Sequence, residues 1–190
     1  MTDSPVKDNS VKDKPPKPVR NLVVVGLGLI GGSLAMAARQ RGVCDQVIGV
    51  VRSTEVQNKA LAMGVVDHAV LSLADVAASL SAGDVIFIAV PTLSVRSVLQ
   101  QVKSLVSSEV TITDGASVKG SVLEDVRAVY GCVPPQMVLG HPIAGSEKSG
   151  VEASNPELYV KHRVILTPTE ETAPQHHQRV AHLWQAVGAE

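Results

Sequence analysis

Three glycines at fixed spacing follow an apolar run close to the start of the chain. The run is LVVV at residues 22–25, and Gly26, Gly28 and Gly31 form the pattern G-x-G-x-x-G in front of a helix-like segment at about 29–41. In such a pattern the first glycine permits a tight turn, the second lets a phosphate approach the backbone, and the third lets the helix pack closely on the strand. Free N–H groups at the start of the helix then face the anion. Because strand and helix flank the motif on the correct sides, it predicts a dinucleotide-binding turn rather than a glycine-rich turn without a ligand.

Composition favours one α/β domain with an aliphatic core. The 190 residues are 45% hydrophobic but only 2% aromatic, as expected of a buried parallel sheet built from Val, Leu, Ile and Ala. The net charge of −1 gives no indication of binding to nucleic acid or to a membrane surface. We expect neither a transmembrane segment nor a signal peptide, because no apolar run has the required length or place. Cys44 and Cys132 lie far apart without metal-ligand spacing, which predicts reduced thiols in a cytoplasmic protein.

Strands and helices alternate along most of the chain. Residues 1–20 are polar, charged and rich in proline and predict a disordered tail, whereas residues 21–190 predict one dinucleotide-binding domain. We expect strands at 22–26, 46–51, 65–70, 84–90, 109–113 and 137–140, and helices at about 29–41, 54–63, 73–80, 93–106 and 118–129. A loop at 140–156 is followed by strand character over 158–167 and helical character over 175–187. The alternation predicts a doubly wound, mostly parallel sheet of the Rossmann type, with ligands at the carboxyl ends of the strands.

The end of the second predicted strand bears on the choice of cofactor. In NAD-specific folds an acidic residue about 20 residues past the glycines accepts a hydrogen bond from the ribose 2′-hydroxyl. Here Val51 is followed by Arg52, Ser53 and Thr54, so no carboxylate stands at that place. An arginine followed by two hydroxyls suits a 2′-phosphate and favours NADP over NAD. The alternative is a solvent-exposed arginine in a loop.

The fourth predicted strand ends in small and apolar residues followed by a proline. Val90 and Pro91 are expected to pass beneath the cofactor, although a buried strand stopped by proline explains them equally well. The expected cofactor-binding residues are Gly26, Leu27, Gly28, Leu29, Ile30, Gly31, Arg52, Ser53, Thr54, Val90 and Pro91.

Two polar clusters follow the next two strands, at 113–120 and 140–150. The carboxyl ends of parallel strands share one edge of the sheet, so both clusters should lie at the same edge as the glycine turn. A neutral imidazole there, that of His141, is suited to accept a hydroxyl proton while hydride leaves the same carbon. A structural histidine is the alternative. The remaining histidines show no motif, and the neighbours His176 and His177 do not face one ligand, so no metal site is expected.

With these motifs the chain resembles the prephenate/arogenate dehydrogenases, including the cyclohexadienyl dehydrogenases, over residues 21–190. The resemblance rests on the glycine turn at 26–34, the Ala-Val-Pro turn at 89–91, the segment 114–120, and above all HPIAGSEKSG at 141–150 followed by VILTP at 164–168. It implies oxidative decarboxylation of prephenate or arogenate with hydride transfer to NAD(P)+, giving 4-hydroxyphenylpyruvate or tyrosine in tyrosine biosynthesis.

The resemblance also implies roles for particular residues. His141 would take the proton of the ring hydroxyl, and Ser117 would hydrogen-bond the substrate hydroxyl and the histidine. Ser146 and Glu147 would line the substrate pocket, and Lys119 would help to position that loop.

The family has a second, helical domain that forms the homodimer and supplies an arginine to the substrate carboxylate. Residues 1–190 show no counterpart, so the resemblance implies a dinucleotide-binding domain truncated before the helical domain, with poor affinity for substrate on its own. Two other interpretations are an NADP-binding module without catalytic activity, which only the chain length supports, and another Rossmann oxidoreductase of the hydroxyacid or imine type. The segment 141–150 argues against the last of these.

Overall fold

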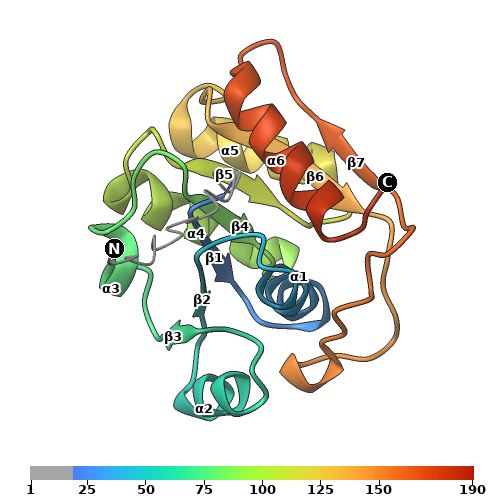
Figure 1. The fold of residues 1–190 in the computed structure, drawn as a ribbon. Helices are drawn as coiled ribbons and strands as arrows, with labels where there is room; N and C mark the ends of the chain where they lie inside the picture. The colour runs from blue at the N-terminus through green and yellow to red at the C-terminus, as the bar shows by residue number, and fades with distance from the viewer. Residues whose placement is uncertain (1–18) are drawn as a thin grey trace, which may run out of the picture.

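Residues 19–190, which the computed structural model describes, form one seven-stranded sheet flanked by helices (Figure 1). The strands are β1 (Asn21–Val25), β2 (Gln46–Val50), β3 (His68–Val70), β4 (Val85–Ile88), β5 (Thr111–Asp114), β6 (Met137–Pro142) and β7 (Val164–Thr167). The helices are α1 (Leu29–Gln40), α2 (Thr54–Ala62), α3 (Ala74–Ala77), α4 (Thr92–Leu105), α5 (Lys119–Tyr130) and α6 (Pro174–Ala186), with a 3₁₀ turn η1 (Val151–Ala153). None of these helices is both long and apolar enough to cross a bilayer.

The order of the strands is β3-β2-β1-β4-β5-β6-β7. Strands β1 to β6 run parallel, and β7 pairs antiparallel with β6. This arrangement confirms the predicted doubly wound, mostly parallel sheet. The chain reverses its direction of growth between β1 and β4, and that switch point is where such folds bind ligands.

The two central strands, β1 from Leu22 onward and β4, are apolar throughout because they are buried on both faces. Leu22 and Val24 of β1 belong to the core beneath α1 and α6, whereas Val23 and Val25 belong to the core beneath α4 and α5. The sheet therefore lies between two helical layers, as the continuous LVVV run predicts.

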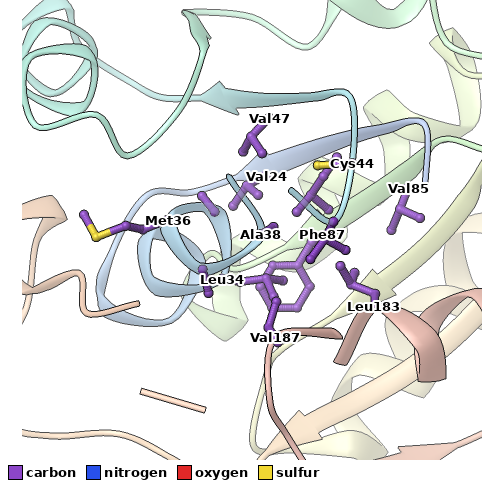
Figure 2. Packing of buried hydrophobic residues seen from close by; sticks show 14 of the residues in the cluster. Val24, Leu34, Met36, Ala38, Cys44, Val47, Val85, Phe87, Leu183 and Val187 are labelled. Atoms are coloured by element: carbon purple, nitrogen blue, oxygen red, sulfur yellow. The ribbon is translucent and has the colours of Figure 1, made fainter. Parts of the chain in front are cut away.

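Three of the four aromatic side chains meet in the core on the α1 and α6 face. Trp184 of α6 packs edge-on against Phe87 of β4 and against Tyr159, with ring centroids 5.6 Å and 5.0 Å apart. Figure 2 shows the Phe87 ring between Leu34 of α1 and two residues at the other side, Leu183 of α6 and Val187 at the end of that helix. The core is thus aliphatic as predicted, except at this one aromatic contact between α6 and the centre of the sheet.

Several predicted boundaries differ from the structure by a few residues. The strand predicted at 65–70 is reduced to β3, because Val65 and Val66 are buried ahead of it without strand pairing. The strand character at 158–167 holds only for β7, since Tyr159 lies in a turn and is fully buried. Conversely, β6 continues through Pro142, where a loop was predicted from residue 140. His141 therefore lies on a strand, opposite Ile165 of β7.

The tail predicted at 1–20 falls, up to residue 18, outside the described residues. Val19 is fully buried, and the guanidinium of Arg20 donates to the carboxylate of Asp84, with Nε 2.8 Å from Oδ1. These two residues belong to the described fold.

Asp84 ties the beginning of β1 to the beginning of β4. Its fully buried carboxylate accepts hydrogen bonds from Arg20, from the backbone N–H of Asn21 at 3.0 Å and from the backbone N–H of Ser81 at 2.8 Å. Removing it leaves two partly buried N–H groups without this acceptor, which is costly.

We predict that Asp84→Ala lowers the free energy of unfolding by about 2–3 kcal/mol, because the N–H groups of Asn21 and Ser81 lose their acceptor. Urea denaturation of the wild type and the variant measures the difference in the free energy of unfolding. Asp125→Ala is the matched control, because Asp125 pairs with Arg96, which is 56% exposed, and such pairs contribute less than about 1 kcal/mol. Equal losses in the two variants would contradict the role given to Asp84.

Candidate functional site

The glycine turn joins β1 to α1 in a conformation that side chains would prevent. Gly26 has a φ of +96°, and a Cβ there would lie 2.6 Å from the carbonyl oxygen of Ala89. A Cβ on Gly31 would overlap the carbonyl oxygen of Gly26 and come within 2.9 Å of the Cβ of Ala89. The helix therefore starts directly above the ends of β1 and β4.

The first turn of α1 faces open space. Gly28 is the N-cap residue, no side chain caps the helix, and a Cβ on Gly28 would meet no atom within 4 Å. Backbone N–H groups without a side-chain acceptor at a helix N-terminus form a site for an anion. The turn therefore fits the pyrophosphate of a dinucleotide.

A cleft of about 950 Å³ extends from this turn along the carboxyl ends of β1, β2 and β4. Of the predicted cofactor-binding residues, those that line it are Gly26, Leu27, Gly28, Arg52, Ser53, Val90 and Pro91. Leu29, Ile30, Gly31 and Thr54 do not line it. The cleft has the place and the size of a dinucleotide site.

Arg52 stands at the mouth of this cleft as an exposed cation. Among residues 19–190 it has neither an ion pair nor a hydrogen bond, so its guanidinium is available to a ligand. Ser53 is the N-cap of α2, and its hydroxyl accepts from the N–H of Val56 at 3.3 Å. A positive charge beside a helix N-terminus favours an anionic group at this end of the cleft.

Sequence reasoning missed part of the cleft. Ser94, Ser97 and Gln101 line it from α4, and their spacing places them on one face of that helix. That spacing was a usable signal. Residues 149–152 also line the cleft, from the far end of the long loop, and nothing in the neighbouring sequence indicates this.

A buried ion pair holds the residue that precedes His141. Asp114, at the end of β5, accepts from the N–H of Gly140 at 3.1 Å and from the N–H of Ala116 at 3.0 Å. Lys119 donates to the Asp114 carboxylate and, at 2.6 Å, to the carbonyl oxygen of Gly140. Both backbone polar groups of Gly140 are therefore bound, which agrees with a positioning role for Lys119.

Burial acts against both charges of this pair. It raises the pKa of Asp114, while the ammonium of Lys119 and the two N–H donors work in the opposite direction. Burial likewise lowers the pKa of Lys119, and the Asp114 carboxylate opposes that shift. Each charge is thus held in place by the other.

The predicted substrate residues lie at the same edge of the sheet as the glycine turn, outside the 950 Å³ cleft. His141 is half-buried on β6, two strands beyond β4, and Ser117 is exposed after β5. The described residues show no hydrogen bond between the two side chains. Ser146 and Glu147 are exposed, and the Ser146 hydroxyl accepts from the N–H of Lys148 at 3.2 Å. This geometry leaves their roles as predictions.

His176, in contrast, is a structural histidine. It belongs to α6 and is buried, with its Nδ1 2.7 Å from the hydroxyl oxygen of Thr111 in β5, which also accepts from Arg179 at 2.7 Å. Within the part of the chain that the structure describes, no three His, Cys, Asp or Glu side chains are grouped as metal ligands.

Comparison with known proteins gives relatives for most of the chain. Residues 34–190 match the family model described as "Prephenate dehydrogenase, nucleotide-binding domain". A cyclohexadienyl dehydrogenase of Zymomonas mobilis is 29% identical over 172 residues, covering 89% of this chain and 56% of that protein. A prephenate dehydrogenase of Bacillus subtilis is 33% identical over 171 residues, covering 88% of this chain and 44% of that protein.

A crystal structure of prephenate dehydrogenase from A. aeolicus in complex with hydroxyphenyl propionate and NAD+ superimposes with a TM-score of 0.82 and 34% identity. The match covers 90% of this chain and 58% of that one. The chain thus spans about half the length of the relatives it matches.

We predict that Lys119→Met lowers the free energy of unfolding by an amount that grows with pH. Without the ammonium, the pKa of buried Asp114 rises further above its unfolded value, so stability is lost as pH rises through the folded pKa. Denaturant unfolding should show a small loss at about pH 4 and a loss of about 3 kcal/mol at about pH 7.

Lys103→Met is the control for that experiment, because Lys103 is an exposed lysine that also donates to a backbone carbonyl, that of Val129. Its effect should be small at both pH values. A loss in Lys119→Met that does not vary with pH would contradict the coupling to Asp114.

Proposed function

The chain belongs to the prephenate dehydrogenase family, and we propose that it forms the dinucleotide-binding part of an NADP-dependent prephenate or arogenate dehydrogenase. The observation that carries the proposal is the placement of His141 at the same sheet edge as a dinucleotide-sized cleft. The reaction is oxidative decarboxylation, and its product is 4-hydroxyphenylpyruvate or tyrosine.

The cleft residues bind and orient the cofactor. The N–H groups at the start of α1 hold the pyrophosphate, since no side chain of the protein caps them. Arg52 pairs with the 2′-phosphate, with Ser53 as a further hydrogen-bonding group. Val90 and Pro91 lie beneath the part of the cofactor that crosses the switch point.

The chemistry requires a hydride acceptor, a proton acceptor and a fixed orientation of the substrate. A nicotinamide cofactor held in the cleft would supply the acceptor for the hydride that leaves the carbinol carbon of the substrate. Neutral His141 takes the proton of the ring hydroxyl. Loss of the ring carboxylate as CO₂ makes the ring aromatic and drives the reaction forward. The protein therefore has to supply mainly orientation and a base.

The remaining site residues position the reacting groups. Ser117 hydrogen-bonds the substrate hydroxyl and His141 once the substrate is bound, and Ser146 and Glu147 line the substrate pocket. Lys119 and Asp114 fix Gly140 and thereby the place of His141 on β6. A base that hardly moves is effective because it needs no reorganisation at the moment of proton transfer.

We propose that the active enzyme needs a second domain in addition to this one. The relatives are about twice as long as the matched region, so the substrate carboxylate clamp and the homodimer contact are assigned to a helical domain outside this chain. We place the protein in the cytoplasm. Family membership does not favour another oxidoreductase of the hydroxyacid or imine type.

We predict that His141→Asn in the full-length protein lowers kcat by about 10²–10⁴-fold, as removal of a general base does. The affinity for NADP+ should stay unchanged, because His141 lies outside the cleft. Prephenate-dependent formation of NADPH and calorimetric titration of NADP+ measure the two quantities. Turnover retained in His141→Asn would contradict the catalytic role.

We predict that Arg52→Asp reverses the cofactor preference. The new carboxylate repels a 2′-phosphate and accepts from a 2′-hydroxyl, so the ratio of NADP+ to NAD+ affinity should fall at least about 100-fold. Arg127→Asp on α5 makes the same change of charge away from the cleft and should leave the ratio unaltered. An unchanged ratio in Arg52→Asp would mean that Arg52 is only a surface residue.

A further inference from the structure

Among residues 19–190, four charged side chains line the cleft, and their charges sum to zero. The cations are Arg52 and Lys59, and the anions are Glu55 and Glu152. Within residues 19–190, Arg52 has no ion partner, whereas the ammonium of Lys59 pairs with the carboxylate of Glu152. The hydrogen bond to Glu152 and its charge raise the pKa of Lys59, with a smaller effect from Glu55. Lys59 is therefore charged and already paired with Glu152.

Lys59 faces the same cleft as Arg52. Helix α2 begins at Thr54, directly after Arg52 and Ser53, and Glu55, Val56 and Lys59 line the cleft from it. The step from Thr54 to Lys59 is about 7.5 Å along a helix axis. Side chains of a helix generally point back toward its N-terminus, and the N-terminus of α2 lies at the Arg52 end of the cleft.

Glu152 is fixed by the segment that carries it. Val151, next to it in η1, is 2% exposed in the core, and the N–H of Asn155 donates to the hydroxyl of Ser33 in α1 at 2.9 Å. The side chain of Glu152 is 56% exposed and that of Lys59 is 38% exposed. An ion pair this exposed to water is weak, so little free energy is lost when Lys59 leaves Glu152 for another anion.

We propose that Lys59 is the second cation of the 2′-phosphate site and that Glu152 is the group it leaves when NADP+ binds. The inference rests on the proposed preference for NADP. A phosphate monoester carries a charge of about −1.5 to −2 at neutral pH, which one arginine does not neutralise. Lys59 is the remaining cation among the described residues that line the cleft. NAD+ has a hydroxyl at that position, so Lys59 keeps its ion pair with Glu152 when NAD+ binds. The exchange of partners therefore adds to the discrimination between NADP+ and NAD+.

Calorimetric titration of the 190-residue chain with NADP+ and with NAD+ tests this inference in two variants that act in opposite directions. Lys59→Met should weaken NADP+ binding about five- to tenfold and change NAD+ binding less than about twofold. Glu152→Gln releases the lysine and should strengthen NADP+ binding about two- to fivefold, again without a comparable effect on NAD+. Both effects should shrink at high salt.

Arg41→Gln and Glu157→Gln are the matched controls. This pair also joins a helix to the segment after residue 150, with Arg41 Nη2 3.1 Å from Glu157 Oε1, and neither residue lines the cleft. Neither control should alter the affinity for either cofactor. Circular dichroism establishes that each variant is folded.

The outcomes separate this inference from the proposal on which it rests. A wild-type chain that binds NAD+ as tightly as NADP+ overturns the cofactor proposal and this inference with it. A wild-type chain that prefers NADP+, but in which Lys59→Met leaves that affinity unchanged or weakens both cofactors equally, overturns this inference alone. Equal weakening would show that the pair merely holds η1 in place.

Discussion

The absence of a side chain at residue 31 sets the distance between α1 and the sheet. Because Gly31 lies against the carbonyl of Gly26, the helix comes close enough to bury every residue from 31 to 38. The same approach points the N-terminus of α1 into the cleft at the ends of β1, β2 and β4. The packing of the core and the shape of the cofactor site thus depend on one contact. A Cβ at residue 31 would push α1 away from the sheet, which would disturb its packing and displace its N-terminus from the cleft.

The next glycine serves a different purpose. A Cβ on Gly32 would overlap the hydroxyl of Ser154, which lies far away in the sequence, and the neighbouring Ser33 accepts from the N–H of Asn155. The first three glycines therefore shape the cofactor turn, and the fourth admits the segment around η1. The loop with Ser146 and Glu147 is consequently fixed at both ends, by the bound Gly140 before it and by α1 after it. Fixing both ends restricts the conformations of the loop.

The sequence was informative where the signal is local. The glycine turn, the alternation of elements and the carboxyl-edge position of His141 follow from short-range patterns, and the structure agrees with them. His141 and Pro142 lie beyond the predicted strand, but pairing with β7 makes them part of β6. The sequence of a single segment does not show which distant segment it will contact. Examples are the pairing of β6 with β7, the Lys59–Glu152 contact across 93 residues and the Ser33–Asn155 contact across 122. They arise only when the fold brings the segments together.

The aromatic contact in the core gives the molecule an optical property. The chain has one tryptophan, Trp184, which is 2% exposed and packs edge-on against Tyr159. The hydroxyl of Tyr159 donates to the carbonyl oxygen of Ile30, in the first turn of α1, at 2.6 Å. A buried fluorophore thus stands one side chain away from the first turn of α1, to which we assign the pyrophosphate. We therefore expect its emission to respond to changes at the glycine turn, without any attached label.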